Sequence, residues 1–453
     1  MVARRGALLF FAVQAALLVA LGVSATLVYA VVIARTVQPV WAGIDVVLIA
    51  GCVALIARFP SKLGFGTLGE RRIVKLVALA AIALAAVLVA QLVFVDANGV
   101  WLDEGQYLAT LREGAIRKSG MAPFNMRWLE PFLAGPLNVV PLEDANALKA
   151  VNFAALVVTA FYLSLLVVRL GMRLRLAALV PVFLLCSYLA VYAGKNRLVL
   201  DPFNYAMFVL LFHTLVHRAH WKYFPIVLLI ASLNSEKAIY WLPVFAVVML
   251  FRRVPWREAF GKTALYAAPT VLYLIAIGLY LRGSPTEGGE KFFENLYVMA
   301  FSWFGGVTNE TVKANTFQAL WFPFGAFTIY ALLALVDCRR WVKAIALLLI
   351  PIFLQALIAH DTKRMVAYAF IVYLPLGMLY LSRALDELPR SIAVPLLVLI
   401  VIISVAQYYL FPTADRLGYA LYYGRTIKLA LAAAEITVTA ALVYLHNAVF
   451  KPS

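Results

Sequence analysis

Long apolar runs recur from one end of this chain to the other, and short segments between them carry most of the charged residues. Of the 453 residues, 64% are hydrophobic and only 13% are charged. A soluble globule of this length needs a more polar surface, so the pattern predicts an all-α fold, a polytopic transmembrane helical bundle of about 12 to 14 spans. Several runs are shorter than the roughly 20 residues that a perpendicular span needs, so we expect some broken or re-entrant helices. The candidate spans are 6–34, 40–57, 73–95, 147–168, 176–193, 202–217, 223–234, 238–251, 263–281, 317–336, 344–359, 365–382, 392–410 and 426–445.

Lys and Arg are concentrated at the N-terminus and after every second apolar run. These segments hold 22 of the 39 basic residues but only five of the 22 acids. Because cytoplasmic loops carry such an excess, we expect a multi-pass protein of the plasma membrane, the bacterial inner membrane, with a cytoplasmic N-terminus. The same segments account for the whole formal charge of +17, so a nucleic-acid partner is not needed to explain it.

The chain divides into three expected parts. Residues 1–58 form an N-terminal transmembrane helix pair, and 59–72 form a basic, Gly-containing cytoplasmic linker. Residues 73–453 hold the remaining spans and every candidate site residue. The basic start resembles that of a signal peptide, but the apolar run that follows is long enough for a retained span.

The first large extracytoplasmic loop follows the third span and opens with two adjacent acids, Asp103 and Glu104. Tyr107 and Leu108 lie four and three residues before Leu111, and Ala115 lies four residues after it, a spacing that predicts a helix lying on the membrane surface. At the start of that helix the macrodipole favours ionised carboxylates, so either acid can act as a base near neutral pH. A capping pair without chemistry explains the same two acids equally well.

Two further groups of charged residues occur in extracytoplasmic segments of the expected topology. Arg127 follows the predicted surface helix, where it can contact a lipid headgroup or simply extend to the membrane interface. Arg197 and Asp201 are four residues apart at the mouth of the next span, which suits a local ion pair. Pro202, directly after Asp201, fits the first turn of a helix.

Glu236 and Lys237 separate two apolar runs that are each too short to cross a membrane comfortably. Such a charged break presents polar groups to a substrate within the bilayer, although a tight extracytoplasmic hairpin is the simpler explanation. His360, Lys363 and Arg364 lie in another short turn. Lys and Arg together suit a phosphate site, and a solvated turn remains the alternative. The three cysteines show no disulfide or metal-binding spacing.

Three stretches of this chain resemble motifs of the GT-C superfamily of integral-membrane glycosyltransferases, in particular its protein O-mannosyltransferase and aminoarabinose-transferase branches. They are WLDEGQYLATLREGAIRKSG, KNRLVLDPFNYAMFVLL and LIASLNSEKAIYWLPV, and the resemblance covers roughly residues 73 to 251. Where those branches have a Pro-Pro-Leu element, this chain has FNMRWLEPFLAGPL. The resemblance implies a GT-C-like transmembrane catalytic domain over 73–453, with surface helices in the first large extracytoplasmic loop.

The resemblance implies inverting transfer of a sugar from a polyprenyl-phosphate donor to a hydroxyl of a glycan, lipid or protein, on the extracytoplasmic side. Asp103 is then the expected base, with Glu104 in reserve. No metal or other cofactor is expected, and membrane lipids are further partners. The other expected substrate-binding residues, which hold the phosphate or orient the acceptor, are Tyr107, Arg127, Arg197, Asp201, Glu236, Lys237, His360, Lys363 and Arg364.

Two other classes of protein are compatible with the sequence. A membrane transporter or flippase has similar spans and intramembrane charges, but it often has an internal repeat, which we do not find in this sequence. A polysaccharide ligase or polymerase also acts on lipid-linked saccharides outside the cytoplasm. By family resemblance its main catalytic loop comes late in the chain, whereas the acid-rich loop here follows the third span.

Overall fold

The computed structural model describes residues 102–114, 116, 126–139, 144–172, 174–177, 179–185, 187, 189, 200–282, 324–358, 362–413 and 425–445. Most of these residues are helical, with no strand among them, which confirms the predicted all-α class. The expected helix pair 1–58, the linker 59–72 and the span 73–95 lie outside the described residues.

The described part of the chain is built from long helices and several shorter elements between them. The main helices are α4 (Leu102–Glu113), α5 (Leu129–Ala134), α6 (Asp144–Arg169), α10 (Asp201–Val216), α11 (Phe224–Asn234), α12 (Trp241–Phe251), α13 (Trp256–Tyr280), α16 (Ala326–Asp337), α18 (Leu349–Ile358), α20 (Phe370–Glu387), α21 (Arg390–Thr413) and α22 (Arg425–Tyr444). The shorter elements are α7 (Leu174–Ala177), α8 (Val180–Leu185), α17 (Arg340–Lys343), α19 (Thr362–Ala367) and the 3-10 turns η3 (Gly135–Val139), η4 (Arg218–Tyr223), η5 (Glu236–Tyr240) and η6 (Ala344–Leu348).

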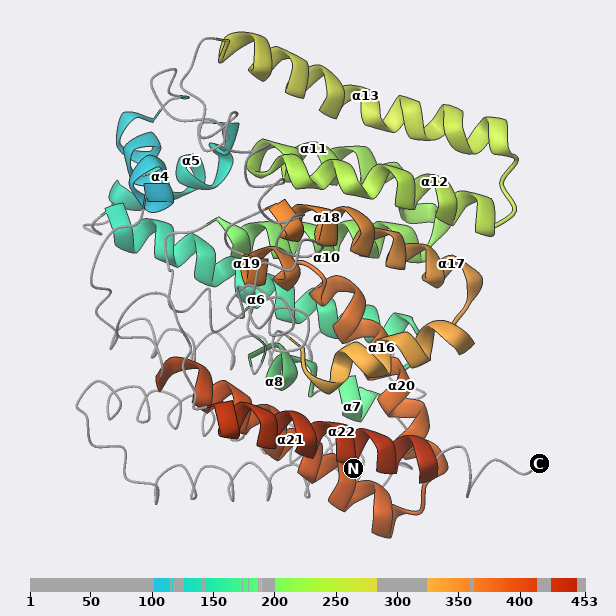
Figure 1. Ribbon diagram of the computed structural model, residues 1–453. Coiled ribbons are helices and arrows are strands. Elements are labelled where there is room, and N and C mark those ends of the chain that lie inside the picture. Colours follow the sequence, from blue (N-terminus) through green and yellow to red (C-terminus); the bar gives the residue numbers. More distant parts are fainter. Residues whose placement is uncertain are drawn as a thin grey trace, which may run out of the picture.

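The helices form a stack (Figure 1). Helix α13 lies along one edge and packs on α11 and α12, α11 packs on α10, and α10 packs on α6. Helices α16 and α20 pack against each other, and α21 and α22 form a pair at the opposite edge. Large aromatic side chains fill the centre: Phe208 contacts Trp241 edge to face at 5.7 Å between ring centroids, and Tyr205 contacts Phe370 at 5.3 Å. Burying such rings is the main stabilising contribution of this core.

Helix α4 forms where the spacing predicted it, but its apolar face does not point away from the protein. Tyr107, Leu108 and Leu111 are buried in a small second core with Leu148 of α6 and Leu200. The prediction that this face lies on the membrane surface is therefore corrected, because α5 and the start of α6 supply the apolar partners that cover it. This packing fixes α4 against the ends of the longer helices.

Most expected spans within the described residues correspond to helices, with two informative differences. Helix α13 begins at Trp256, well before the expected 263, and its first turns carry an exposed ion pair between Glu258 and Lys262 at 2.6 Å. In the described part of the expected span 176–193, the structure has the end of α7 and then the short helix α8. As the sequence predicts, the two helices on either side of Glu236 and Lys237 are short: α11 and α12 have 11 residues each, so each is about 17 Å long and too short to cross a membrane alone.

Among the described residues, α6 and α13 are long and apolar enough to cross a membrane. Helix α6 is largely covered by its neighbours, whereas α13 is not. The outer face of α13 exposes Leu265, Leu272 and Leu279, each by about two thirds. An exposed apolar face of this length is unusual in a soluble monomer.

Candidate substrate-binding site

Arg127 and Glu236 form an ion pair between the segment before α5 and the turn between α11 and α12. The guanidinium of Arg127 donates to both carboxylate oxygens of Glu236, from Nη2 at 2.6 Å and from Nε at 3.2 Å. Its third nitrogen, Nη1, donates to the hydroxyl of Tyr107 on α4 at 3.3 Å. Helix α4 and a turn more than 100 residues further along the chain therefore meet at one planar cation, which is the geometry for which Arg is suited.

In the turn between α11 and α12, the adjacent charged residues Glu236 and Lys237 have different environments. Ser235 has an extended backbone and its hydroxyl accepts a bond from the backbone N–H of Lys237 at 3.4 Å, which starts the 3-10 turn η5. The side chain of Glu236 remains 35% exposed, whereas that of Lys237 is only 3% exposed. Glu236 is thus the part of this break that solvent or a substrate can reach.

Lys237 extends into a second group of polar residues centred on Asp201, the first residue of α10. The Nζ atom of Lys237 lies 4.0 Å from Oδ1 of Asp201 and 4.2 Å from the ring centroid of Tyr368. The hydroxyl of Tyr368 donates to the same Oδ1 atom at 2.5 Å. An ammonium group shielded from water is stabilised here by both a carboxylate and an aromatic face.

Buried amides extend this group toward α5. Asn204 donates to the Tyr368 hydroxyl at 3.1 Å, and Asn234 donates to Oδ1 of Asn204 at 3.0 Å. Oδ1 of Asn234 then accepts the backbone N–H of Glu130 at 3.1 Å. We call Tyr107, Arg127, Glu130, Asp201, Asn204, Asn234, Glu236, Lys237 and Tyr368 the polar network.

Arg127 and Glu236 stabilise each other's charged forms, and both lie outside the expected spans. Burial alone would lower the pKa of Arg127, but Glu236 and then Tyr107 raise that pKa well above its usual value. Burial alone would raise the pKa of Glu236, but Arg127, with a smaller contribution from Lys237, lowers it to about 2. The pair is therefore ionised throughout the physiological pH range.

Glu130 behaves differently from Glu236. Its side chain is fully buried, and neither carboxyl oxygen has a hydrogen-bond partner among the described residues. Burial, opposed by Asn234 and reinforced by the negative charge of Asp201, raises the pKa of Glu130 well above its usual range. Within the polar network, the environment thus holds Glu236 ionised and favours the neutral form of Glu130.

The sequence-predicted residues fall into three groups. Tyr107, Arg127, Asp201, Glu236 and Lys237 are all brought together in the polar network. At Asp103, Glu104, Lys363 and Arg364 the description covers the backbone alone, while Arg197 and His360 lie outside the described residues.

For Asp103, Glu104, Lys363 and Arg364, the backbone shows in which helix each residue lies. Asp103 and Glu104 occur in the first turn of α4, as expected, with Asp103 one turn before Tyr107. Lys363 and Arg364 occur in the first turn of α19 rather than in an open turn. Because Tyr368 directly follows α19, the end of the segment that contains Lys363 and Arg364 reaches Asp201.

Sequence reasoning missed Glu130, Asn204, Asn234 and Tyr368. The first three lie within three residues of residues that the sequence did single out, and a polar side chain beside an apolar run is a signal that could have found them. Nothing in the sequence marks Tyr368 among the many aromatic residues of its span. Its role follows only from the packing of α10 against the segment before α20.

No family model matches this chain, and comparison with curated proteins and with solved structures found no match. Within the described residues, no group of three or more His, Cys, Asp or Glu side chains is placed to hold a metal ion. The described part is thus an all-helical bundle with an ion-paired polar network at the ends of its helices.

Proposed function

We propose that this protein is a multi-pass membrane glycosyltransferase that moves a sugar from a polyprenyl-phosphate donor to an acceptor hydroxyl on the extracytoplasmic side. The proposal combines the sequence resemblance to the GT-C superfamily with the geometry of the polar network. It assigns the reaction to the end of the bundle where α4, α10, η5 and α19 meet.

One observation carries the proposal. Four segments were singled out from the sequence for separate reasons, and residues of all four, or directly adjacent to them, contact one another. Tyr107 of α4 contacts Arg127, which contacts Glu236; Lys237, next in the chain, contacts Asp201 and Tyr368. A packed helical bundle has no structural need to bring charged residues from three of these segments to one place, because burying charge is costly. Such clusters are typical of substrate sites.

Membrane insertion is supported by the exposed apolar face of α13 and by the distribution of basic residues. Helix α13 packs on α11 and α12 by one face, and its other face suits contact with lipid. The turn that contains Glu236 precedes α12, and the basic residues Arg252 and Arg253 follow it. If those basic residues are cytoplasmic, the polar network lies at the extracytoplasmic end.

The chemistry requires a base that takes the proton of the acceptor hydroxyl and cationic groups that stabilise the departing phosphate. In the proposed step, Asp103 takes the proton of the acceptor hydroxyl, whose oxygen attacks the anomeric carbon of the donor sugar. The bond from that carbon to the phosphate oxygen breaks, and the lipid phosphate leaves with the electron pair. The anomeric configuration is inverted, and Lys363 and Arg364 stabilise the phosphate by charge-assisted hydrogen bonds.

The burial of Lys237 modifies its expected role. A lipid phosphate could reach its ammonium only by displacing Asp201 or Tyr368, so we assign Lys237 and Asp201 to positioning η5 and α10. Glu236 is partly exposed and ionised, which suits a hydrogen bond to a sugar hydroxyl. Arg127 then fixes the orientation of Glu236.

The test is transfer by the purified protein reconstituted in liposomes with a panel of polyprenyl-phosphate sugars and a panel of acceptors. We expect release of polyprenyl phosphate together with a glycosylated acceptor for one donor, and this donor should also accumulate in cells that lack the protein. Movement of a lipid-linked saccharide across the bilayer without transfer would instead indicate a flippase. Transfer of a preassembled glycan would indicate a ligase or polymerase.

A further inference from the structure

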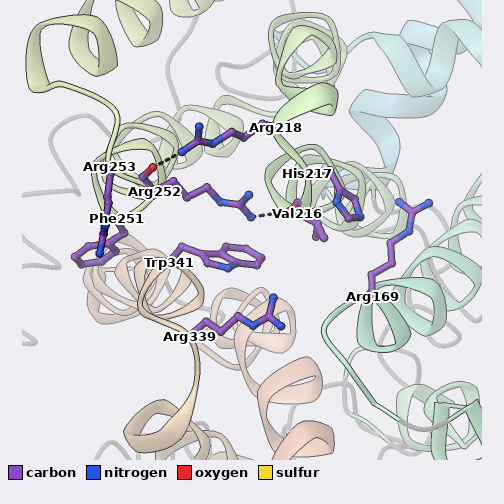
Figure 2. Close-up of a pocket in the computed structure, with 9 residues that line it drawn as sticks. All are labelled: Arg169, Val216, His217, Arg218, Phe251, Arg252, Arg253, Arg339 and Trp341. Atoms are coloured by element: carbon purple, nitrogen blue, oxygen red, sulfur yellow. Dashed lines mark hydrogen bonds between the residues drawn. The ribbon is translucent and has the colours of Figure 1, made fainter.

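The opposite end of the same helices holds a cleft of about 430 Å³ whose lining is dominated by arginine (Figure 2). Helix α10 runs from Asp201 in the polar network to Val216 at the cleft, a length of about 24 Å. None of the nine described residues that line the cleft is acidic. Its arginines lie at the end of α6, after α10, after α12 and before α17: Arg169, Arg218, Arg252, Arg253 and Arg339. We call this the arginine cleft.

Arg252 organises the arginine cleft. Its Nη2 donates to the carbonyls of Leu215 and Val216 at 3.0 and 2.6 Å, which satisfies two carbonyls at the C-terminal end of α10. Its guanidinium also stacks on Trp341, 4.3 Å from the ring centroid, and its own carbonyl accepts a bond from Arg218. Figure 2 shows Arg252 between Arg218 and Trp341. Arg252 is therefore the structural arginine of the cleft.

Arg253 occupies a backbone position that normally belongs to glycine. Helices α6 and α12 end in the same hydrogen-bonded turn: Gly171 and Met172 donate back to Val168 and Val167, as Arg253 and Val254 do to Leu250 and Met249. The turn requires positive φ, which is 107° at Gly171 and 62° at Arg253. A side chain there is disfavoured, so the presence of Arg253 in the cleft indicates a use for its charge.

The arginine cleft concentrates positive charge. Burial, followed by the neighbouring charges of Arg218 and Arg339, lowers the pKa of Arg252. An anion in the cleft would offset this repulsion. The planar guanidinium group donates two parallel hydrogen bonds, which match two oxygens of a phosphate. A monatomic anion offers no such pair of acceptor atoms.

We propose that the arginine cleft binds the phosphate of an anionic lipid headgroup in the cytoplasmic leaflet. Phe251, which lines the cleft, is 47% exposed, and Trp256, shortly after it, is 61% exposed. A lipid can therefore place its phosphate among the arginines while its acyl chains contact these apolar side chains. Basic pockets between transmembrane helices bind headgroups in this way on the cytoplasmic side. The proposal rests on the inferred membrane orientation and not on the transferase activity.

The test is lipid binding by the full-length protein in a zwitterionic detergent, measured by native mass spectrometry and by the shift of the thermal unfolding midpoint. Phosphatidylglycerol, phosphatidylcholine and inorganic phosphate are titrated separately. We expect phosphatidylglycerol to bind and stabilise the protein and the other two to have little effect. Equal stabilisation by phosphatidylcholine would overturn the proposal. Stabilisation by inorganic phosphate as strong as by phosphatidylglycerol would overturn the assignment to a lipid.

The variants separate the arginine cleft from general surface charge. Arg253→Gly puts the residue that the turn prefers in place of arginine, and Arg339 makes no side-chain capping bond to α17, so the pair Arg253→Gly and Arg339→Ala should fold. We expect at least a tenfold loss of phosphatidylglycerol affinity, because each charge-assisted contact to phosphate contributes about that much. The matched control is Arg257→Ala with Lys262→Ala, which removes the same charge from α13. An equal loss in the control would contradict a specific site.

Discussion

The guanidinium of Arg127 is held edge-on against the carboxylate of Glu236 by two hydrogen bonds, across 109 positions of the chain. This pair ties the first large loop to the break between α11 and α12. Arg127 is almost fully buried, while Glu236 is about one third exposed. A charge left without its partner therefore costs more free energy at Arg127, which water cannot reach, than at Glu236. Loss of the carboxylate should therefore destabilise the fold more than loss of the guanidinium.

We expect Glu236→Gln to destabilise the protein by about 2 to 4 kcal/mol, because it leaves the buried Arg127 without a charge partner. The value is below that of a fully buried pair because solvent screens the exposed side of Glu236. Arg127→Met should cost less, and the double variant should recover part of the loss. Chemical denaturation in detergent provides the free energies of unfolding for this double-mutant cycle.

The pH dependence of the stability of Glu236→Gln provides the control. The pKa of Glu236 is lowered on folding, so its contribution to stability is present above the unfolded pKa of about 4.3 and is lost as the pH falls toward 2. The difference in stability between the parent and Glu236→Gln should therefore shrink below about pH 4. A difference that stays constant down to pH 2 would show that the charge of Glu236 is not what stabilises the fold.

Unlike Glu236→Gln, the variant Glu130→Gln should not destabilise the protein at neutral pH. Because the pKa of Glu130 is raised on folding, its favourable contribution is present below about pH 4.3 and is lost as the pH rises through the raised value. The neutral amide avoids this loss, so the variant should match or exceed the parent in stability at neutral pH and show less pH dependence. Thermal unfolding between pH 4 and 8 measures this, with Glu258→Gln on α13 as an exposed control. Destabilisation at pH 7 by Glu130→Gln alone would contradict the assignment.

The two neighbouring arginines after α12 should respond in opposite ways. Arg252→Ala removes two hydrogen bonds to the last carbonyls of α10 and should cost about 1 to 3 kcal/mol. Arg253→Gly relieves a disfavoured backbone conformation, offset by greater freedom of the unfolded chain, so stability should be unchanged or rise by up to about 1 kcal/mol. Denaturation curves of the two variants test this contrast. A loss of stability in Arg253→Gly as large as in Arg252→Ala would refute it.

The sequence predicts the helices of this fold well because their apolar runs are long and their ends are marked. The charged start of α4, Pro202 in the first turn of α10 and the break at Glu236 all occur where expected. What the apolar pattern could not predict is which neighbour covers each helix. The face of α4 that includes Tyr107 looks the same in sequence whether lipid or α6 covers it.

The candidate site was predictable in its parts but not in its connections. The four-residue spacing predicts a pair between Asp201 and Arg197, which lies outside the described residues. The described contacts of Asp201 with Lys237 and Tyr368 are not indicated by any such spacing. Local spacing indicates only local pairs. Contacts between segments far apart depend on how α10 packs against the residues before α20, which periodicity does not encode.

The inferred membrane topology predicts which side of the membrane each loop faces. A single cysteine placed at Ser119, in the first large loop, should react with a membrane-impermeant thiol reagent added from outside, because the orientation inferred from Lys and Arg puts this loop on the extracytoplasmic side. Labelling of intact cells measures this. A cysteine introduced at Arg257 is the control and should react only after the membrane is opened. The reverse result would contradict both the orientation and the proposed reaction.

The most direct measurement of the proposed function is the transfer rate of Asp103→Asn. Asp103 lies in the first turn of α4, one turn before Tyr107 of the polar network, and the substitution keeps the size of its side chain while removing the charge. If it is the base, the folded variant should still bind the lipid-linked donor, but its rate should fall by about 10² to 10⁴. Glu104→Gln should transfer at close to the parental rate. Parental rates in both variants would contradict the account, because the reaction would then not depend on the carboxylates at the start of α4.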